Sequence, residues 1–302
     1  MSLPLKDIIK IGEKQLSDAG VADAAIDAKE LYCHMMNIDR TRLMLRWQDI
    51  LQDNQCEAYF DLVAKRAARV PLQHITGVQE FMGLPFKVSD KVLIPRQDTE
   101  TLVEDALEVI QKNKLRGDEL NMKPRRSWTI LDLCTGSGAI GLSLAKLGGD
   151  VKVTCSDLSE EALAVAESNA TALDCKGVKF VKSDMLETFR GKLGNKKFDM
   201  IISNPPYIRP EVIAELEPEV KEHEPMMALD GGEDGLDFYR IIAAQAPEFL
   251  KKDGVVMVEI GHDQMDDVTR IFAETDKYCY ITGLKDLAER DRIVVAILSP
   301  KK

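Results

Sequence analysis

A glycine-rich turn is the first segment of this sequence whose residue types could do chemistry. Gly136, Gly138 and Gly141 follow an apolar run that ends at Leu133, so they lie where a strand would pass into a helix. Because glycine has no Cβ, the backbone there can turn sharply and come close to a ligand. Asp157 ends the next apolar run, at the position of an acid that accepts hydrogen bonds from ribose hydroxyls. The pattern predicts an adenosine cofactor.

The glycine spacing alone leaves the identity of that cofactor open. The three glycines also match the G-x-G-x-x-G fingerprint of dinucleotide-binding enzymes, so a nicotinamide dehydrogenase is one interpretation. A glycine turn without any ligand is another.

The tetrapeptide Asn204-Pro205-Pro206-Tyr207 reduces the number of enzyme classes that fit the sequence. It follows the apolar run Met200–Ser203, and ligands bind at the carboxyl ends of such strands in open α/β sheets. The two prolines restrict the backbone, so the loop presents an amide side chain and one or two unpaired carbonyls as fixed acceptors. Such acceptors suit the NH2 of an amide or of a base, and Tyr207 offers a flat surface to a planar group. A plain Asn-Pro turn is the structural alternative.

Strands that alternate with helices must position these residues. The apolar runs 129–133, 151–156, 178–182, 200–203 and 255–260 predict strands, with helices over 98–110, 140–147, 160–171 and 237–250. Because the strands are nearly continuous apolar runs, we expect a doubly wound α/β fold with a mostly parallel sheet covered on both faces. The segments 278–284 and 293–298 predict an antiparallel pair at its edge, and Asp98 or Thr99 is the expected N-cap of the first helix.

The N-terminal part of the chain has a different pattern. Residues 1 to about 75 show helical spacing of apolar residues, whereas 81–88 carry the turn residues of a β-hairpin. We therefore expect three parts: an all-helical domain over 1–76, a β-hairpin linker over 77–97 and an α/β domain over 98–302. The helical part is a candidate for recognising a protein substrate.

Composition excludes several classes of protein. The chain has 302 residues, of which 45% are hydrophobic and 30% charged, and its net charge is -11. These values argue against disorder and against a protein that coats a phosphate backbone. The six cysteines do not have the spacing of metal ligands, and we expect them to be buried thiols in a protein of a reducing compartment. The four histidines form no zinc-binding motif. No metal site is expected. Charged residues near the N-terminus interrupt any signal-peptide pattern, so we expect a cytoplasmic protein.

The combined motifs resemble a known family. The strings 132–141 and 204–207, with Asp157, are similar to class I S-adenosylmethionine-dependent methyltransferases that act on planar NH2 groups. More narrowly, the whole chain resembles the HemK/PrmC family, the protein-glutamine N5-methyltransferases of peptide chain release factors. The strings that carry this narrower resemblance are 69–77, 81–86, 94–100, 228–236 and 259–262. Cys134, Gln97 and Met185 depart from the glycine, proline and aromatic residue common in the family.

The resemblance implies a Rossmann-like fold and a role for each motif residue. It implies that the methionine part of S-adenosylmethionine contacts Cys134, Thr135, Gly136, Ser137 and Gly138. The ribose would contact Asp157, and the adenine would contact Asp184 and Met185. Asn204 would bind the substrate next to the methyl group, and Pro205, Pro206 and Tyr207 would complete a glutamine pocket. The product would be S-adenosylhomocysteine, and the partner a release factor carrying a Gly-Gly-Gln motif.

A nucleic-acid amine methyltransferase with the same tetrapeptide is the main alternative. Two basic clusters could contact phosphates: Lys123, Arg125 and Arg126, and then Arg190, Lys192, Lys196 and Lys197. Solvated loops are the simpler interpretation of both, and the net charge of -11 also favours it. We therefore expect no direct nucleic-acid binding. A binding module without activity is a further alternative, and the intact Asn204–Tyr207 string argues against it.

Overall fold

The computed structural model describes residues 3–120, 122–191 and 196–300. Within this part the chain divides into two compact units. One contains the chain up to Val78 together with Leu216–His223, and the other contains Gln79–Glu215 and the chain from Glu224 onward. We call them the helical unit and the sheet unit.

The helical unit is built on amphipathic helices. They are α1 (Leu5–Asp18), α2 (Ala24–Met36), α3 (Arg40–Leu45), α4 (Asp53–Ala67) and α5 (Leu72–Thr76), and the segment 216–223 adds α11 (Pro218–Lys221). The apolar stripes of the longer helices meet in one core, where the buried rings of Tyr32 and Tyr59 pack edge to face with centroids 6.1 Å apart. The all-helical expectation is confirmed for the described residues, although the short helices α3 and α5 lack a readable periodicity.

Buried ion pairs attach the segment 216–223 to the helical unit. Arg66 of α4 lies between Asp27, at 2.7 Å, and Glu219, at 2.8 Å, and Arg69 also pairs with Glu219. The expected division placed this segment in the α/β domain, whereas the structure places it with the helices. The reason is electrostatic, because two arginines of the helical unit neutralise one carboxylate.

The sheet unit has a seven-stranded sheet with the strand order β10-β11-β9-β8-β5-β6-β7. Its strands are β5 (Trp128–Leu133), β6 (Val151–Asp157), β7 (Lys179–Lys182), β8 (Phe198–Ser203), β9 (Leu250–Glu259), β10 (Tyr278–Lys285) and β11 (Asp291–Leu298). Strands β5 to β9 run parallel, and β11 pairs antiparallel with both β9 and β10. The doubly wound sheet and the antiparallel edge pair are confirmed, with β10 outermost.

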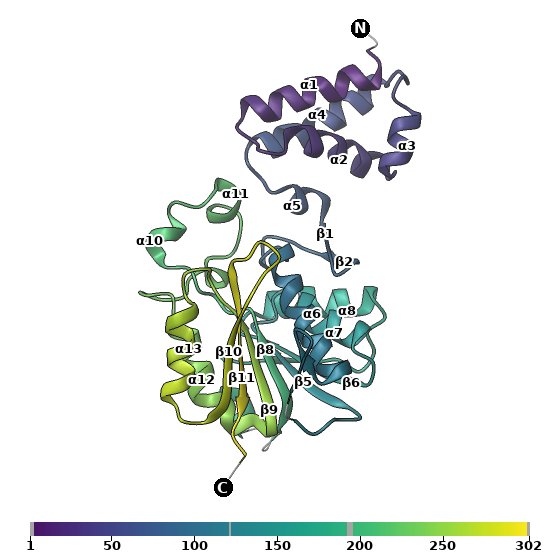
Figure 1. The fold of residues 1–302 in the computed structure, drawn as a ribbon. Helices are drawn as coiled ribbons and strands as arrows, with labels where there is room; N and C mark the ends of the chain where they lie inside the picture. The colour runs from purple at the N-terminus through teal and green to yellow at the C-terminus, as the bar shows by residue number, and fades with distance from the viewer. Residues whose placement is uncertain (1–2, 121, 192–195, 301–302) are drawn as a thin grey trace. The chain divides into compact units, whose positions relative to one another are not determined.

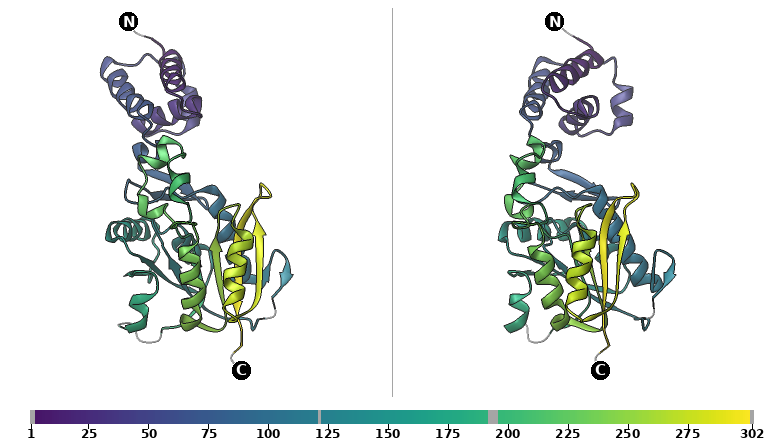
Figure 2. Two further views of the ribbon diagram at one scale, coloured as in Figure 1. Left: turned by 90° about the vertical axis from the view of Figure 1, so that its left-hand side faces the viewer. Right: turned by 60° about the vertical axis from the view of Figure 1, so that its left-hand side comes forward.

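Helices cover both faces of this sheet (Figures 1 and 2). One face carries α6 (Gln97–Lys112), α7 (Ala139–Leu147) and α8 (Glu160–Ala172), and the other carries α9 (Glu187–Gly191), α12 (Asp237–Phe249) and α13 (Met265–Glu274). Successive residues of a strand alternate between the two cores: Ile130 packs with the first set of helices and Leu131 with the second. The chain leaves β5 toward β6 and later returns to its other side at β8. This strand order makes a switch point where ligands commonly bind.

The expected linker hairpin is part of the sheet unit's core. Strands β1 (Val78–Phe81) and β2 (Leu84–Lys87) form it, and Phe81 and Phe86 are buried with ring centroids 6.0 Å apart. Asn169 of α8 exchanges hydrogen bonds with the backbone of Lys87 and also donates to the Ser137 carbonyl at 2.8 Å. Asn169 therefore joins the hairpin to the glycine loop.

Several local expectations were wrong. The N-cap of α6 is Arg96, so Asp98 and Thr99 lie inside the first turn, where the Thr99 hydroxyl serves another partner. The sequence predicted no element between the helix α6 and the strand β5, where the structure has the two-residue strands β3 (Lys114–Leu115) and β4 (Asp118–Glu119). The remaining short helices, α10 (Pro210–Ile213) and the 3-10 turn η1 (Met226–Ala228), and the longer α13 were not expected. All six cysteines are free thiols, but as whole residues only Cys33 and Cys155 are buried, whereas Cys56, Cys134 and Cys175 are partly exposed and Cys279 is exposed.

The described residues lack two kinds of feature. No helix there combines the length and apolar character needed to cross a bilayer. The same residues contain no group of three or more histidine, cysteine or acidic side chains arranged to hold a metal ion.

Candidate active site

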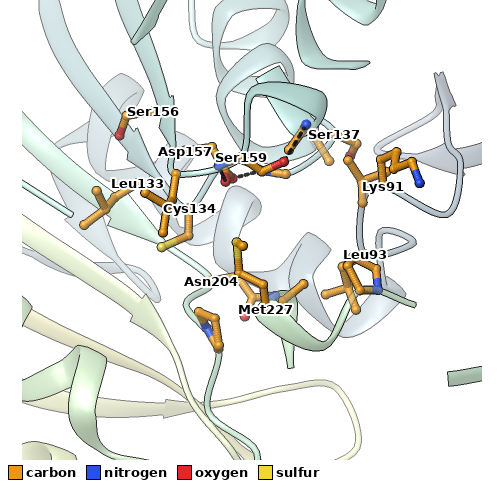
Figure 3. A pocket seen from close by; sticks show the side chains of 18 of the residues that line it. Lys91, Leu93, Leu133, Cys134, Ser137, Ser156, Asp157, Ser159, Asn204 and Met227 are labelled. Atoms are coloured by element: carbon orange, nitrogen blue, oxygen red, sulfur yellow. Dashed lines mark hydrogen bonds between the residues drawn. The ribbon is translucent and has the colours of Figure 1, made fainter. Parts of the chain in front are cut away.

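A cavity of about 330 Å³ opens at the carboxyl ends of β5, β6 and β8. In Figure 3, Asp157 and Cys134 lie on one side of it, and Asn204 and Met227 lie on the opposite side. The volume is within the range of small-molecule sites, which is about 300–1,000 Å³. The cavity therefore gathers residues from the glycine loop and from the Asn204–Tyr207 loop in one place.

The glycine loop forms one wall, and a buried carboxylate supports it from behind. Gly136 has a φ of +54°, and a Cβ at that position would meet no protein atom within 4 Å. Asp132 is fully buried, and its Oδ2 accepts hydrogen bonds from the Thr135 hydroxyl and from the Gly141 N–H. Burial raises the pKa of Asp132 to about 7, while these two hydrogen bonds oppose the rise. Asp132 thus fixes the curvature of the loop.

Cys134 lines the cavity with a left-handed backbone. Its φ is +59°, which side-chain-bearing residues seldom adopt and glycine adopts freely. Its Sγ lies 3.9 Å from the Sδ of Met185, which also lines the cavity and has a φ of +44°. Burial raises the pKa of the Cys134 thiol, so the thiol is neutral and contributes shape and polarisable contact rather than a nucleophile.

Asp157 presents a carboxylate that the backbone holds in place. Its Oδ2 accepts from the Gly136 N–H at 2.9 Å, and its Oδ1 accepts from the Ser159 N–H at 3.0 Å. Burial raises its pKa, and these hydrogen bonds act against the rise. Each carboxylate oxygen can accept a further hydrogen bond, so Asp157 can also bind hydroxyl groups of a ligand in the cavity.

Asn204 contributes an amide whose two ends have different surroundings. Its Nδ2 donates to the Thr99 hydroxyl at 3.2 Å, and both residues line the cavity. The side-chain oxygen is therefore the end available to accept from a ligand. The following prolines are buried, which keeps the loop rigid.

The side chain of Tyr207 turns away from the cavity. Its hydroxyl donates to Glu259 Oε1 at 3.4 Å, and its backbone carbonyl accepts from Gln264 Nε2 at 3.1 Å. Gly231 and Gly235 pack against the same backbone, because a Cβ on either would come within 2.6 Å of it. The glycine-rich string 228–236 thus packs closely against the Asn204–Tyr207 loop and holds it in place.

The structure brings most of the expected site residues to the cavity. Those that line it are Cys134, Gly136, Ser137, Asp157, Asp184, Met185, Asn204 and Pro206, whereas Thr135, Gly138, Pro205 and Tyr207 do not. Gly138 has a packing role, because a Cβ there would lie 2.9 Å from Leu142 Cδ1 and 3.1 Å from Ala166 Cβ. A larger residue at Gly138 would thus collide with Leu142 and Ala166.

Residues outside the expected set complete the walls. They come from the segment after the hairpin, from α6, from the loop after β6 and from the segment around η1, and they include Asp90–Leu93, Pro95, Arg96, Thr99, Leu158, Ser159, Glu161, Ser183, Pro225, Met227, Ala228 and Phe238. Arg96 is fixed by an ion pair of 2.6 Å with Glu224, whose side chain is buried. The strings 94–100 and 228–236 pointed to two of these segments, although they indicated no role for any one residue.

Comparison with known proteins decides the family. The PrmC N-terminal domain model matches residues 7–77, and the methyltransferase small domain model matches residues 118–216. The release factor glutamine methyltransferase of Clostridium acetobutylicum is 41% identical over 90% of this chain and 90% of its own length. The enzyme of Geobacter sulfurreducens is 38% identical over 92% of this chain and 91% of its own length. The enzyme of Agrobacterium fabrum is 38% identical over 93% of this chain and 93% of its own length.

This chain belongs to the release factor glutamine methyltransferase family.

The solved structures agree with the fold of this methyltransferase. A 16S rRNA N2 G1207 methyltransferase of Thermus thermophilus, in complex with AdoMet and guanosine, superposes with a TM-score of 0.50. It is 17% identical and covers 74% of this chain and 50% of its own, so it supports the sheet architecture alone.

Many of the cationic residues in the two basic clusters of this methyltransferase contact other residues of the same chain. Arg125 pairs with Asp199 at 2.8 Å and lies over the Trp128 ring. In the second cluster, Arg190 pairs with Glu187 and Glu248, Lys196 donates to Thr154, and Lys197 donates to the Glu248 carbonyl. Lys123 and Arg126 are exposed, and Lys192 lies outside the described residues. These contacts favour a structural role for the cationic residues that make them.

Proposed function

We propose that this enzyme transfers a methyl group from S-adenosylmethionine to the side-chain amide nitrogen (N5) of the glutamine in the Gly-Gly-Gln motif of peptide chain release factors. The observation that carries this proposal is the orientation of Asn204. Because its Nδ2 is engaged by Thr99, its Oδ1 is the atom left to accept from an NH2 group in the cavity. The curated relatives are named for glutamine methylation on release factors, which supports an amide and not a base as the substrate.

The cavity fits S-adenosylmethionine in two respects. Asp157 offers an anchored acceptor for ribose hydroxyls, and Gly136 leaves open the space that a side chain would fill. We assign Asp184 and Met185 to the adenine, and Cys134 and Ser137 to the methionine part. Thr135 and Gly138 act on the cofactor indirectly, because they shape the loop that carries these residues.

The residues of the chain activate the substrate by orienting it. A bound S-adenosylmethionine would supply an electrophilic methyl group on sulfur, and S-adenosylhomocysteine would be the product that remains after its transfer to nitrogen. The amide nitrogen is a poor nucleophile because its lone pair is delocalised. Asn204 Oδ1 accepts a hydrogen bond from one of its N–H groups, which favours positive charge on nitrogen and aims its lone pair. The Pro205 carbonyl, expected as the second acceptor, belongs to a residue that does not line the cavity. Orientation of this kind contributes about 7 kcal/mol or more to barrier reduction. The displaced proton leaves to water.

Pro206 and Tyr207 support the same pocket. Pro206 lines the cavity next to Asn204, and Tyr207 anchors the end of the loop through Glu259 and Gln264. We retain both in the glutamine site, with Tyr207 acting as an anchor.

The helical unit is proposed to dock the protein substrate. Met44 and Leu45 of α3 are 61% and 83% exposed, and large apolar side chains at such exposure suit a protein partner. Leu45→Glu is expected to raise KM for an intact release factor about tenfold, without changing KM for a short Gly-Gly-Gln peptide. Leu287→Glu is the matched control, because Leu287 is 90% exposed in the sheet unit. Equal effects of both variants would contradict a docking role for the helical unit.

Mass spectrometry of a release factor tests the proposed function. The purified factor is incubated with the enzyme and S-adenosylmethionine, and the Gly-Gly-Gln peptide is sequenced. We expect a mass increase of one methyl group on the glutamine, and none on a factor whose glutamine is replaced by alanine. Methylation of DNA or RNA with no change in the release factor would instead support the nucleic-acid alternative. We propose a cytoplasmic location, which the free thiols of the six cysteines and the expected substrate support.

A further inference from the structure

Arg96 lines the cavity and is anchored there by a buried carboxylate. It is the N-cap residue of α6, and its side chain is 40% exposed. Its Nη2 lies 2.6 Å from Oε2 of Glu224, whose side chain is 1% exposed. An arginine that left this position would leave an unpaired charge in the interior, which is costly. The ion pair therefore holds the guanidinium at the cavity wall.

Most of the hydrogen-bond donors of Arg96 remain available to a ligand. A guanidinium has five N–H donors in a planar fork. Within residues 3–120, 122–191 and 196–300, the Arg96 side chain makes one hydrogen bond, which goes to Glu224. The remaining N–H groups can donate to oxygen atoms of a molecule in the cavity, and such charge-assisted hydrogen bonds are stronger than neutral ones.

Two connections link Arg96 to the substrate side of the cavity. Thr99, one helical turn after Arg96, accepts from Asn204 Nδ2 at 3.2 Å. Glu224 begins the segment that continues to Met227, which lines the cavity and is 57% exposed. In Figure 3, Asn204 and Met227 lie on the same side of the cavity, away from the glycine loop. Arg96 is thus connected to the wall that carries Asn204, and not to the wall assigned to the ribose.

A Gly-Gly-Gln segment offers few groups for recognition besides the glutamine side chain. The two glycines have no side chains, so a protein can form hydrogen bonds with them only through their main-chain N–H and C=O groups. The absence of a Cβ also lets a bulky donor approach that main chain closely. Guanidinium N–H groups can only donate, so their partners in this segment are the carbonyl oxygens.

We propose that Arg96 is a specificity-determining residue, which donates hydrogen bonds to the carbonyl oxygens of the two glycines that precede the substrate glutamine. This inference rests on the proposed function. Arg96 positions the main chain of the substrate, while Asn204 receives its side-chain amide. Loss of Arg96 therefore weakens binding of the release-factor segment and leaves binding of S-adenosylmethionine intact.

Arg96→Gln and Arg96→Lys test the role of the guanidinium. We expect KM for a short Gly-Gly-Gln peptide to rise about 10- to 100-fold in Arg96→Gln, with a smaller change in kcat, because hydrogen bonds from a charged donor are lost. Arg96→Lys keeps a positive charge beside Glu224 but lacks the planar fork, so it should recover only part of that loss. The calorimetric affinity for S-adenosylmethionine is expected to stay within about threefold of the wild type.

A modified peptide tests the same contact from the side of the substrate. Replacing the two glycine carbonyl oxygens by sulfur gives thioamides, which are weaker hydrogen-bond acceptors. With the wild-type enzyme we expect this replacement to raise KM about tenfold. With Arg96→Gln it should change KM by less than about twofold, because the donor is already absent. The wild-type comparison needs no variant, so it tests the proposal even if Arg96→Gln folds poorly.

Arg116→Gln is the matched control. The side chain of Arg116 is 38% exposed and pairs at 2.7 Å with the buried carboxylate of Asp105, but it does not line the cavity. We expect Arg116→Gln to have the wild-type KM for each of the two peptides.

An unchanged KM in Arg96→Gln, an equal effect of sulfur on both enzymes, or no effect of sulfur on the wild type refutes the role of Arg96. A loss of S-adenosylmethionine affinity with an unchanged peptide KM also refutes it, and assigns Arg96 to the cofactor instead. A wild-type enzyme that leaves the Gly-Gly-Gln glutamine unmethylated refutes the proposed function and this inference with it. A wild type that methylates the peptide, with Arg96→Gln indistinguishable from it, refutes the inference alone.

Discussion

Substitution of Asp157 can distinguish the role of this carboxylate in cofactor binding from its role in supporting the glycine loop. The carboxylate lines the cavity and accepts two backbone hydrogen bonds, at 2.9 Å from Gly136 and 3.0 Å from Ser159. In our account its other lone pairs accept ribose hydroxyls. Hydrogen bonds to a charged group contribute about 1.5–3 kcal/mol, so Asp157→Ala is expected to weaken S-adenosylmethionine binding about 10- to 150-fold.

The same substitution also leaves two backbone donors without an acceptor. We therefore expect a loss of about 1–3 kcal/mol in the free energy of unfolding, which urea denaturation measures. Asp157→Asn keeps the shape and one carbonyl oxygen. It should thus retain more stability than Asp157→Ala while still losing affinity, because one end of its amide is a donor.

Isothermal titration calorimetry with S-adenosylmethionine is the assay. Glu161→Ala is the control, because Glu161 is another acidic residue that lines the same cavity and is exposed. We expect its affinity to stay within about threefold of the wild type, since exposed charged contacts contribute little. A folded Asp157→Ala enzyme with unchanged affinity would remove Asp157 from the site and refute the reasoning.

Two further substitutions address the framework. Gly138→Val is expected to cost about 2–5 kcal/mol of stability, because it strains a φ of +83° and overlaps Leu142, and a normal urea midpoint would contradict this packing role. Glu219→Gln is expected to cost about 1–2 kcal/mol at pH 7, after allowance for solvent screening. The ion pairs with Arg66 and Arg69 lower the pKa of Glu219 from 4.5 to about 2, so this stabilisation is present above pH 4.5 and is lost as the pH falls toward 2. A difference from wild type that is independent of pH between 7 and 3 would exclude these ion pairs as its source.

Local pattern was sufficient to predict the sheet and the main site residues. The strands are short apolar runs bounded by polar turns, so their positions could be read directly, and parallel strands bring their carboxyl ends together. Asp157 and Asn204 each come at or just after the end of such a strand, which is why both could be placed at one crevice before the fold was known.

Long-range contacts account for what the sequence could not predict. Thr99 and Asn204 are 105 positions apart, and no local pattern indicates that one orients the other. Likewise, α11 has only four residues, and its attachment to the helical unit depends on Arg66 and Arg69, about 150 positions earlier. The left-handed backbone of Cys134 was also hidden, because the residue type gives no sign of it.

The single-turnover rate of the Asn204→Ala enzyme tests the central claim most directly. The rate is measured with saturating S-adenosylmethionine and release factor, and the cofactor affinity is measured on the same preparation. Loss of one oriented polar contact in a transition state costs on the order of 100-fold or more in rate. We predict a decrease of that size, with cofactor affinity within about threefold of the wild type. A preserved rate, or an equal loss of rate and cofactor affinity, would contradict the assignment of Asn204 to the substrate amide.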